Sequence, residues 1–167
     1  IESSWLNRGQ AMATVLEQTS QSSVAVVTKP AALSMQLAQR ICAFRVDDLS
    51  DAMLDAARVA IIDTIAVTLL GSLEDSVRML RTTLGDSVSG PAQILGSGEA
   101  ASVLDAAMVN GIASHALDFD DFTQEFGGHP SVPIVAGLLA LAQANRCSGR
   151  EFVAAYVVGF ETESRIA

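Results

Sequence analysis

Two histidines and three aspartates lie close together in the second half of the chain, and these residue types move protons near neutral pH. His115 and His129 are the two histidines of the 167-residue sequence. Asp118, Asp120 and Asp121 stand between them. Imidazoles and carboxylates so near one another in sequence predict an acid–base site rather than a solvated loop.

Each of these residues also has an interpretation that involves no chemistry. Aspartates at a helix end or turn commonly serve as caps or as solvated charges. We favour Asp118 as functional, because it stands between Leu117 and Phe119 and is expected to face the apolar side. His129 follows two glycines that let a backbone approach a ligand, and it precedes a proline that can begin a helix. We expect His115 to pack or to support the site rather than to react.

A metal centre is a second interpretation of the same stretch. Imidazole nitrogens and carboxylate oxygens are suitable metal ligands, and five residues offer them: His115, Asp118, Asp120, Asp121 and His129. Their spacing matches no strong motif such as H-E-x-x-H, so we predict acid–base chemistry without a metal or another cofactor. No G-x-S-x-G motif is present to suggest a serine nucleophile.

Apolar, helix-forming segments flank the polar stretch, and they must position it. The pattern predicts helices over Ala100–Ala116 before it and Val132–Ala144 after it. Further helices are predicted from residue 33 to 44, from Asp51 to Leu70, from Glu74 to Leu84 and from Gly149 to Ala167, with a short extended stretch from Ala92 to Leu95.

The segment Asp51–Leu70 has the strongest helical pattern. Oxygens just before it can cap its first turn, and Gly71 is expected to end it. Its apolar stripe comprises Leu54, Ala57, Ile61, Ile65 and Leu69. Val59, Ile62 and Val67 widen that stripe, so we predict a central helix that is mostly buried.

Composition favours one helical domain. The length of 167 residues suits a single core. The composition, 50% hydrophobic and only 17% charged, suggests either helices that are buried on more than one face or a surface for a missing partner. We predict an all-α, helical bundle-like domain over residues 31–167, preceded by a poorly determined arm over residues 1–30.

The net charge and the cysteines narrow the partners and the compartment. A net charge of −9 and a pI of about 4.5 argue against nucleic acid and anionic membranes. No apolar run reaches the length of a membrane span. Cys42 and Cys147 suggest no disulfide framework, which favours a reducing compartment. We expect the cytoplasm, or the mitochondrial matrix in a eukaryote.

Three stretches together resemble the MmgE/PrpD family, which includes 2-methylcitrate dehydratases, cis-aconitate decarboxylases and an iminodisuccinate epimerase. They agree with the family in order and spacing over about residues 33–167. The stretches are IIDTIAV at 61–67, DAAMVNG at 105–111 leading into HALDFDD at 115–121, and GHPS at 128–131 followed by SGREF at 148–152 and GFE at 159–161.

The resemblance implies part of the family's helical domain and chemistry at a carbon next to a carboxylate. The expected reaction is dehydration or decarboxylation of a small tricarboxylate-type acid, or an epimerisation. On this basis His129 carries the proton, and Asp118 orients it or contacts the substrate. Phe122 occupies the usual place of a family threonine, so Thr123 is expected to bind substrate in its stead, together with Ser131.

Family members are much longer than this chain, and they supply basic residues that complete the site. We therefore expect an incomplete site. The high apolar content and the missing domain should leave an exposed hydrophobic surface, so we also expect a homodimer. Two alternatives stay open: a truncated, non-catalytic helical dimerisation module, and a metal-dependent hydrolase that uses the His/Asp cluster.

Overall fold

The computed structural model describes residues 32–85, 89–124 and 126–166. Contacts divide the chain into two units, Ile1–Ala32 and Leu33–Ala167, and the arm expected over residues 1–30 lies outside the described residues. The second unit contains α2 (Leu33–Ala43), a 3-10 turn η1 (Val46–Asp48), α3 (Asp51–Gly71), α4 (Asp75–Leu84), β1 (Ala92–Ile94), β2 (Glu99–Ala101), α5 (Val103–His115), α6 (Ser131–Asn145) and α7 (Gly149–Ile166).

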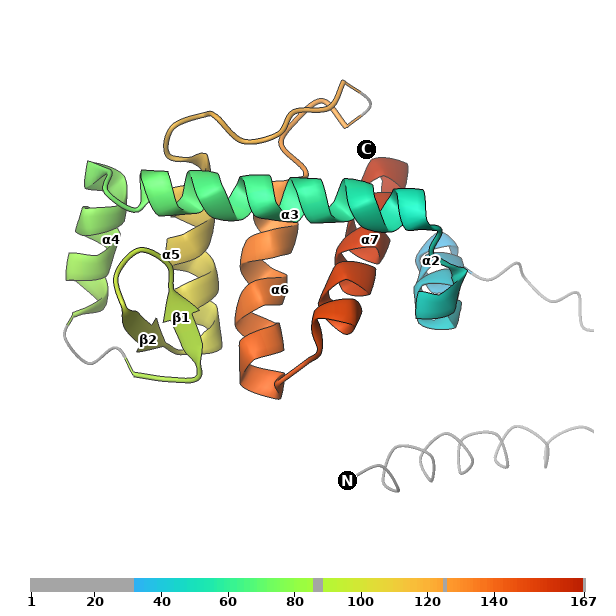
Figure 1. Cartoon of the computed structure of the whole chain (residues 1–167), viewed down its shortest axis with the longest axis horizontal. Helices are drawn as coiled ribbons and strands as arrows, with labels where there is room; N and C mark the ends of the chain where they lie inside the picture. Colours follow the sequence, from blue (N-terminus) through green and yellow to red (C-terminus); the bar gives the residue numbers. More distant parts are fainter. Residues whose placement is uncertain (1–31, 86–88, 125, 167) are drawn as a thin grey trace, which may run out of the picture. The chain divides into compact units, whose positions relative to one another are not determined.

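Helices dominate the second unit, which confirms the predicted fold class. The helices α5, α6 and α7 lie side by side, and the long helix α3 crosses all three of them (Figure 1). The helix α4 packs against α5 at one end of this layer. The loop between α5 and α6 lies along the end of the layer, above α3 in the view of Figure 1.

The helix α3 begins as predicted but buries only one side. The hydroxyl of Ser50 accepts a hydrogen bond from the backbone N–H of Met53 at 3.3 Å, which caps the first turn. At the other end Gly71 lies so close to α5 that a β-carbon there would stand 2.0 Å from the carbonyl oxygen of Ala113. Val59 and Ile62 are 70% and 67% exposed, so the prediction of a mostly buried helix was wrong.

A small hairpin modifies the predicted start of α5. The extended stretch after residue 91 is confirmed as β1, which pairs in antiparallel fashion with β2. The helix predicted from Ala100 instead begins at Val103, because residues 99–101 form β2 and Ser102 caps the helix. Buried Asn110 ties the hairpin to α5: its side chain accepts from Leu95 N–H at 2.9 Å and donates to the Gln93 carbonyl at 2.9 Å.

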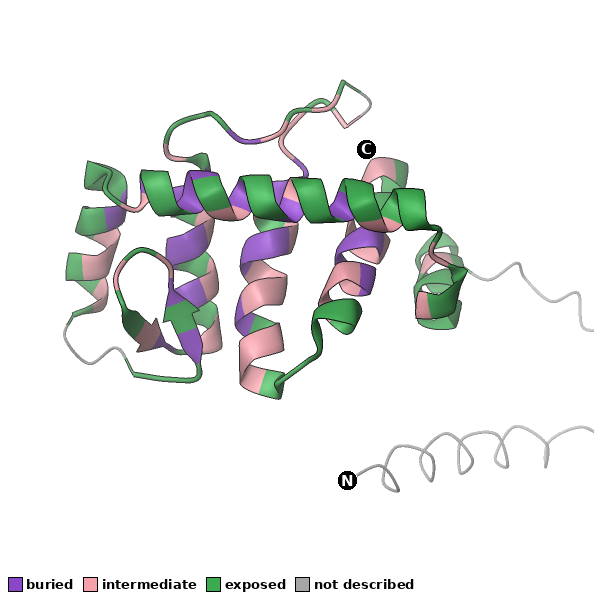
Figure 2. Cartoon of the chain, viewed as in Figure 1, coloured by how far each residue is buried: buried purple, intermediate pink, exposed green. Residues whose placement is uncertain are grey.

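The buried residues, drawn in purple in Figure 2, include two apolar clusters. One joins the hairpin to α4, α5 and α6 through Val77, Ile94, Val109 and Ala140, among others. The other joins α3, α6 and α7 through Ala57, Ile61, Val135, Tyr156 and Val157. These clusters fix both helices that flank the α5–α6 loop.

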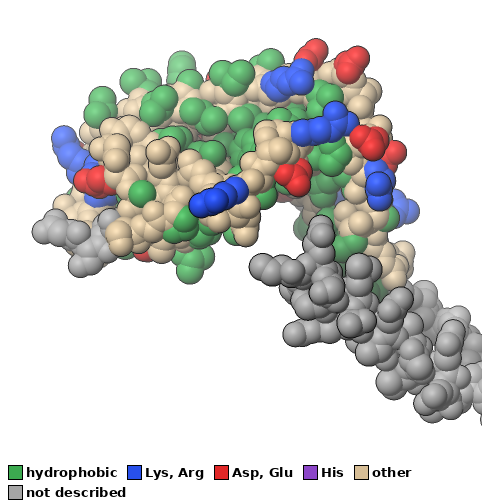
Figure 3. Space-filling view, turned by 60° about the horizontal axis from the view of Figure 1, so that its bottom comes forward, with side chains coloured by type: hydrophobic (Ala, Val, Ile, Leu, Met, Phe, Trp, Pro, Cys, Tyr) green, Lys and Arg blue, Asp and Glu red, His purple; other side chains and the backbone are tan. Residues whose placement is uncertain are grey.

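Much apolar surface remains uncovered in the second unit. Figure 3 shows hydrophobic side chains spread over one face, with charged side chains between and around them. No single described helix is long and apolar enough to cross a membrane. Among the described helices, α3 and α4 taken together have the length and apolar composition of a membrane span, but the pair is bent by 80°.

Candidate active site

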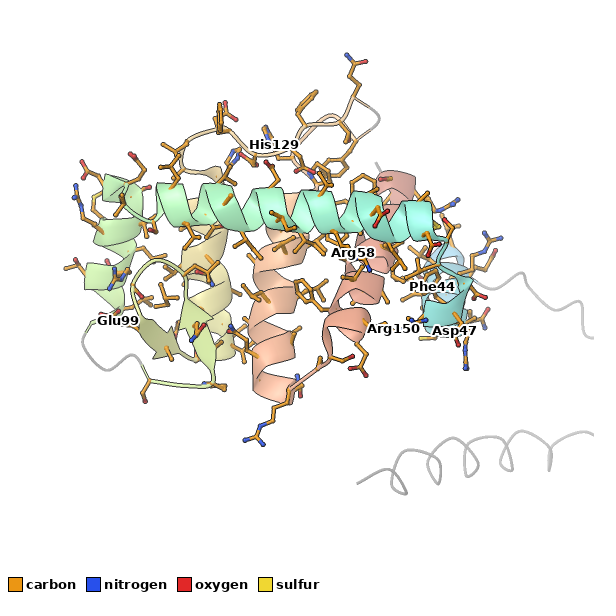
Figure 4. All side chains as sticks on the ribbon, in the orientation of Figure 1. Phe44, Asp47, Arg58, Glu99, His129 and Arg150 are labelled. Carbon is orange, nitrogen blue, oxygen red and sulfur yellow. The ribbon has the colours of Figure 1, made fainter. Side chains whose placement is uncertain are left out.

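The α5–α6 loop, residues 116–130, collects the polar groups that the sequence analysis singled out. His115 is the last residue of α5, and Ser131 is the first residue of α6. His129 projects from the loop above α3 in the view of Figure 4. The two ends of the loop are therefore held by the adjacent helices α5 and α6, which pack against each other.

Two imidazoles surround one carboxylate in this loop. The Nδ1 atom of His115 lies 3.0 and 3.1 Å from the two carboxylate oxygens of Asp120. The Nδ1 atom of His129 lies 3.0 Å from Oδ2 of the same carboxylate. The two rings meet edge to face, with their centroids 4.7 Å apart. The structure thus brings His115, Asp120 and His129 together as the sequence suggested.

The structure buries the side chain of Asp120 and exposes that of Asp118, for which the sequence predicted an apolar environment. The side chain of Asp118 is 79% exposed, whereas that of Asp120 is fully buried. Asp118 has a φ of 51° and follows the end of α5, where its backbone N–H bonds to the carbonyl of His115 at 3.1 Å. This turn directs the Asp118 carboxylate outward, where Oδ1 lies 3.4 Å from Nε2 of His129. Asp118 therefore does not face an apolar side as predicted, although it remains beside the imidazole.

Asp121 points into a different network. Its carboxylate accepts hydrogen bonds from the backbone N–H of Ser131 at 3.2 Å and from the Ser131 hydroxyl at 2.5 Å. The Ser131 hydroxyl also lies 2.7 Å from the hydroxyl of Tyr156 on α7. A carboxylate at the first residue of α6 is favoured by the unpaired backbone N–H groups there. Ser131 is fully buried, so the substrate-binding role expected for it would require these bonds to open.

Burial changes the acidity of two groups in this region. Burial raises the pKa of Tyr156, and the carboxylates of Asp121 and Glu163 raise it further, while the hydrogen bond with Ser131 opposes them. Burial also raises the pKa of Glu163, with a smaller contribution from Asp121. One carboxylate oxygen of Glu163 is buried without a hydrogen-bond partner. Tyr156 could not be predicted as part of this network from the sequence, because it lies 25 residues beyond Ser131.

Thr123 shapes the far end of the loop. Its backbone N–H donates to the Gly128 carbonyl at 3.1 Å, and its carbonyl accepts from Gly127 N–H at 2.9 Å. Its hydroxyl accepts from the backbone N–H of Phe126 at 3.4 Å. These bonds hold the turn that delivers His129, and the expected contact between Thr123 and a substrate carboxylate stays a prediction.

A recess of about 470 Å³ opens beside the two imidazoles. Among the described residues, its lining comprises Gly111, Ile112, His115, Ala116, His129 and Val132. No lysine or arginine belongs to this set, so the imidazoles are the groups in the described lining that can carry positive charge. An anionic ligand would therefore depend on the imidazoles or on groups outside that lining.

The same residues satisfy the general requirements for binding a cation. One ligating atom from each of His115, Asp118, Asp120 and His129 lies within 4.8 Å of the others, and nitrogen and oxygen are suitable ligands for divalent ions. The imidazole and carboxylate of His115 and Asp120 also satisfy one another directly. The geometry therefore permits either a bound cation among these four side chains or a direct contact between Asp120 and the imidazoles. Removal of metal with a chelator distinguishes the two.

Comparison with known proteins identifies a related family. Residues 35–167 match the model of the MmgE/PrpD N-terminal domain. Cis-aconitate decarboxylase of Homo sapiens is 28% identical over 145 residues, which cover 80% of this chain and 29% of that protein. Cis-aconitate decarboxylase of Mus musculus is 29% identical over 136 residues, which cover 73% and 26%. The matched part of the chain thus covers less than a third of the length of either relative.

Proposed function

Because the chain belongs to the MmgE/PrpD family, we propose that it carries the acid–base part of a lyase site for a small tricarboxylate-type acid. The observation that best supports this is the pair of imidazoles around buried Asp120, beside a recess. The names of two relatives, both cis-aconitate decarboxylases, support the substrate class. Dehydration and decarboxylation are both compatible with such a site.

His129 is the proton carrier in this proposal. In a dehydration, the neutral imidazole removes a proton from the carbon next to a carboxylate, and the electron pair left there forms a double bond to the neighbouring carbon. The hydroxyl on that neighbouring carbon leaves and takes the proton from the imidazolium as water. In a decarboxylation, the carbon–carbon bond breaks, carbon dioxide leaves, and the electron pair left on carbon takes a proton from the imidazolium. Asp118, 3.4 Å from Nε2 of His129, is placed to contact the imidazolium or the substrate.

Either reaction develops negative charge on a substrate that is already anionic, and preorganised positive charge would be needed to stabilise it. The described lining of the recess contains no lysine or arginine. We therefore propose that the remaining charges come from parts of the family architecture that this chain does not match. The 167-residue chain alone should show little or no turnover.

Turnover of cis-aconitate and 2-methylcitrate tests this proposal. The 167-residue chain and the protein expressed from its complete coding sequence are assayed side by side, for carbon dioxide release and for loss of 2-methylcitrate. We expect activity only where the complete site is present. Robust activity of the 167-residue chain that survives His129→Gln would contradict both the proton carrier and the need for further residues.

One observation favours a second candidate function, self-association through α3. Val59, Ile62, Ala66 and Leu69 are exposed at alternating spacings of three and four residues, which is the pattern of a helix that packs lengthwise against another helix. We propose that a second copy of the chain covers this stripe, with the two α3 helices parallel.

Charge complementarity supports that arrangement. Arg58 and Asp63 flank the stripe on opposite sides, five residues apart, and residues so placed pair between parallel helices. Arg58 of each copy would then meet Asp63 of the other. Figure 4 labels Arg58 on α3, where it now bonds to exposed Asp55 at 2.7 Å and can change partners.

Light scattering at micromolar concentrations tests self-association. The dimer should be lost in Ile62→Glu and kept in Leu104→Glu, a matched control because Leu104 is 81% exposed on α5. Asp63→Arg should weaken the dimer, and Arg58→Asp in the same chain should restore it. A monomer at all micromolar concentrations would contradict this candidate function. The exposed stripe on α3 would then be covered by other parts of a longer chain.

A further inference from the structure

Among the described ionisable residues of the α5–α6 loop, Asp120 has the most buried side chain. Its carboxylate is fully buried, and Nδ1 atoms of two imidazoles lie 3.0 Å from it. Asp118, in contrast, is 79% exposed and approaches the other nitrogen of His129 at 3.4 Å. A buried carboxylate strongly prefers hydrogen-bond donors around it. Both rings therefore place Nδ1, which can donate a hydrogen bond, toward the Asp120 carboxylate.

The nitrogen that faces a carboxylate determines where an imidazole carries its proton. A carboxylate only accepts, so a neutral ring beside it is held with the proton on the facing nitrogen, and the opposite nitrogen keeps a free lone pair. For His129 the facing atom is Nδ1, and the opposite atom, Nε2, is the one beside Asp118. This arrangement leaves Nε2 as the nitrogen that can take a proton.

A second observation concerns the same atom. Nδ1 of His129 is buried, and it has no aligned hydrogen-bond partner although Oδ2 of Asp120 lies 3.0 Å away. A buried ring nitrogen without a partner is costly, and a small rotation of the ring toward this oxygen removes the cost. The distance, the burial and the carboxylate's capacity to accept all point to one bond.

We propose that Asp120 is the positioning residue of the site: it holds His115 and His129 in the tautomer with a proton on Nδ1 and presents Nε2 of His129 as the reacting nitrogen. The reacting role rests on the proposed function, whereas the tautomer does not. Asp118 then contacts the His129 imidazole from the solvent side and determines the tautomer of neither ring. This assignment moves the orienting role from Asp118, where the sequence analysis placed it, to Asp120.

Nitrogen-15 spectra of the imidazole side chains test the proposal without any substrate. The chain contains two histidines, so the spectrum contains two ring systems, and His115→Gln identifies which one is His129. At a pH where the rings are neutral, we expect both in the Nδ1–H form. A wild-type His129 in the Nε2–H form, which is the commoner form in water, would overturn the proposal.

Two substitutions sharpen the test. Asp120→Asn places an amide that can donate to Nδ1, so His129 should change to the Nε2–H form, while the matched control Asp118→Asn should keep the wild-type tautomer. Thermal unfolding verifies that each variant is folded. If Asp120→Asn does not fold, the His129 tautomer in the wild-type and Asp118→Asn spectra still tests the proposal. A tautomer that changes in Asp118→Asn instead would overturn the proposal.

The same spectra separate this proposal from the others. Wild-type spectra that change on exhaustive chelation would place a cation among the four side chains and overturn the direct bond between Asp120 and the imidazoles. The confirmed tautomer together with absent turnover in the complete protein would contradict the proposed function and leave the positioning role of Asp120 intact.

Discussion

Asp120 and Asp121 are adjacent in the sequence, and they enter two different networks. Asp120 faces two imidazoles, groups that gain and lose protons near neutral pH. Asp121 faces the hydroxyl and the backbone N–H of Ser131 at the start of α6, and that hydroxyl also contacts the Tyr156 hydroxyl; these groups stay protonated near neutral pH. The comparison teaches that the partner, rather than the carboxylate, decides whether an aspartate supports proton transfer or anchors a loop.

The first prediction removes the proton carrier from the Asp120 network. In the protein that carries the complete site, His129→Gln should keep the fold and lower kcat about a hundredfold or more, because an amide cannot exchange a proton near neutral pH. Steady-state kinetics with cis-aconitate or 2-methylcitrate measure the loss. Asp118→Asn should lower kcat less, since its side chain is exposed; a larger loss there would reverse the ranking.

The second prediction removes the anchor from the Asp121 network. Asp121→Ala should lower the free energy of unfolding by about 1–3 kcal/mol, because the buried Ser131 and the start of α6 lose their acceptor. Urea unfolding followed by circular dichroism measures it. Asp118→Ala, at an exposed position, serves as the control and should change stability little. Equal losses in the two variants would remove the distinction between anchor and exposed carboxylate.

The third prediction concerns metal. If direct bonds hold the Asp120 network, dialysis against a chelator should leave the unfolding temperature unchanged and metal analysis should find no stoichiometric ion. A clear drop in unfolding temperature on chelation, restored by a divalent ion, would instead show that the four side chains bind a cation.

The fourth prediction uses the pKa of Tyr156, which burial raises. Tyr156 is the one tyrosine of the sequence, so absorbance at 295 nm during an alkaline titration reports it alone. Because the folded chain keeps this proton longer than the unfolded chain, the stability it contributes should be present below about pH 10 and lost as the pH rises through the folded pKa. A midpoint at or below the usual tyrosine value would contradict the burial of this network.

The smallest effect is expected at Glu163. Its carboxylate contributes to the raised pKa of Tyr156 after burial and Asp121, so Glu163→Gln should lower the Tyr156 midpoint slightly. Glu163 itself has a raised pKa, so its contribution to stability should be present in acid and lost as the pH rises through that pKa. The matched control Glu161→Gln, exposed on the same helix, should leave the Tyr156 midpoint in place.

The sequence predicted the helices well because their apolar periodicity and caps are local signals, as at Ser50 and α3. It failed at Val59 and Ile62, because periodicity reports apolar faces without saying which face a neighbour covers. Strand β2 was not predicted, because EAA at 99–101 also suits a helix and its pairing with β1 is a tertiary contact.

The site was predicted as a group of residues but not in its internal arrangement. The proximity of His115, His129 and the aspartates followed from their spacing. The burial of Asp120 rather than Asp118 depends on the backbone turn at Asp118, with its φ of 51°, which no neighbouring side chain reveals. Tyr156 reaches Ser131 and the Asp121 network only because α7 packs against α6, which the sequence does not show.

The imidazole nitrogen-15 spectrum of Asp121→Asn, recorded beside that of Asp120→Asn, tests the separation of the two networks most directly. If the adjacent aspartates have distinct roles, Asp121→Asn should keep His115 and His129 in the Nδ1–H form despite lower stability, and Asp120→Asn should change the His129 tautomer. Tautomers that change in a folded Asp121→Asn variant, or that survive in Asp120→Asn, would contradict the account.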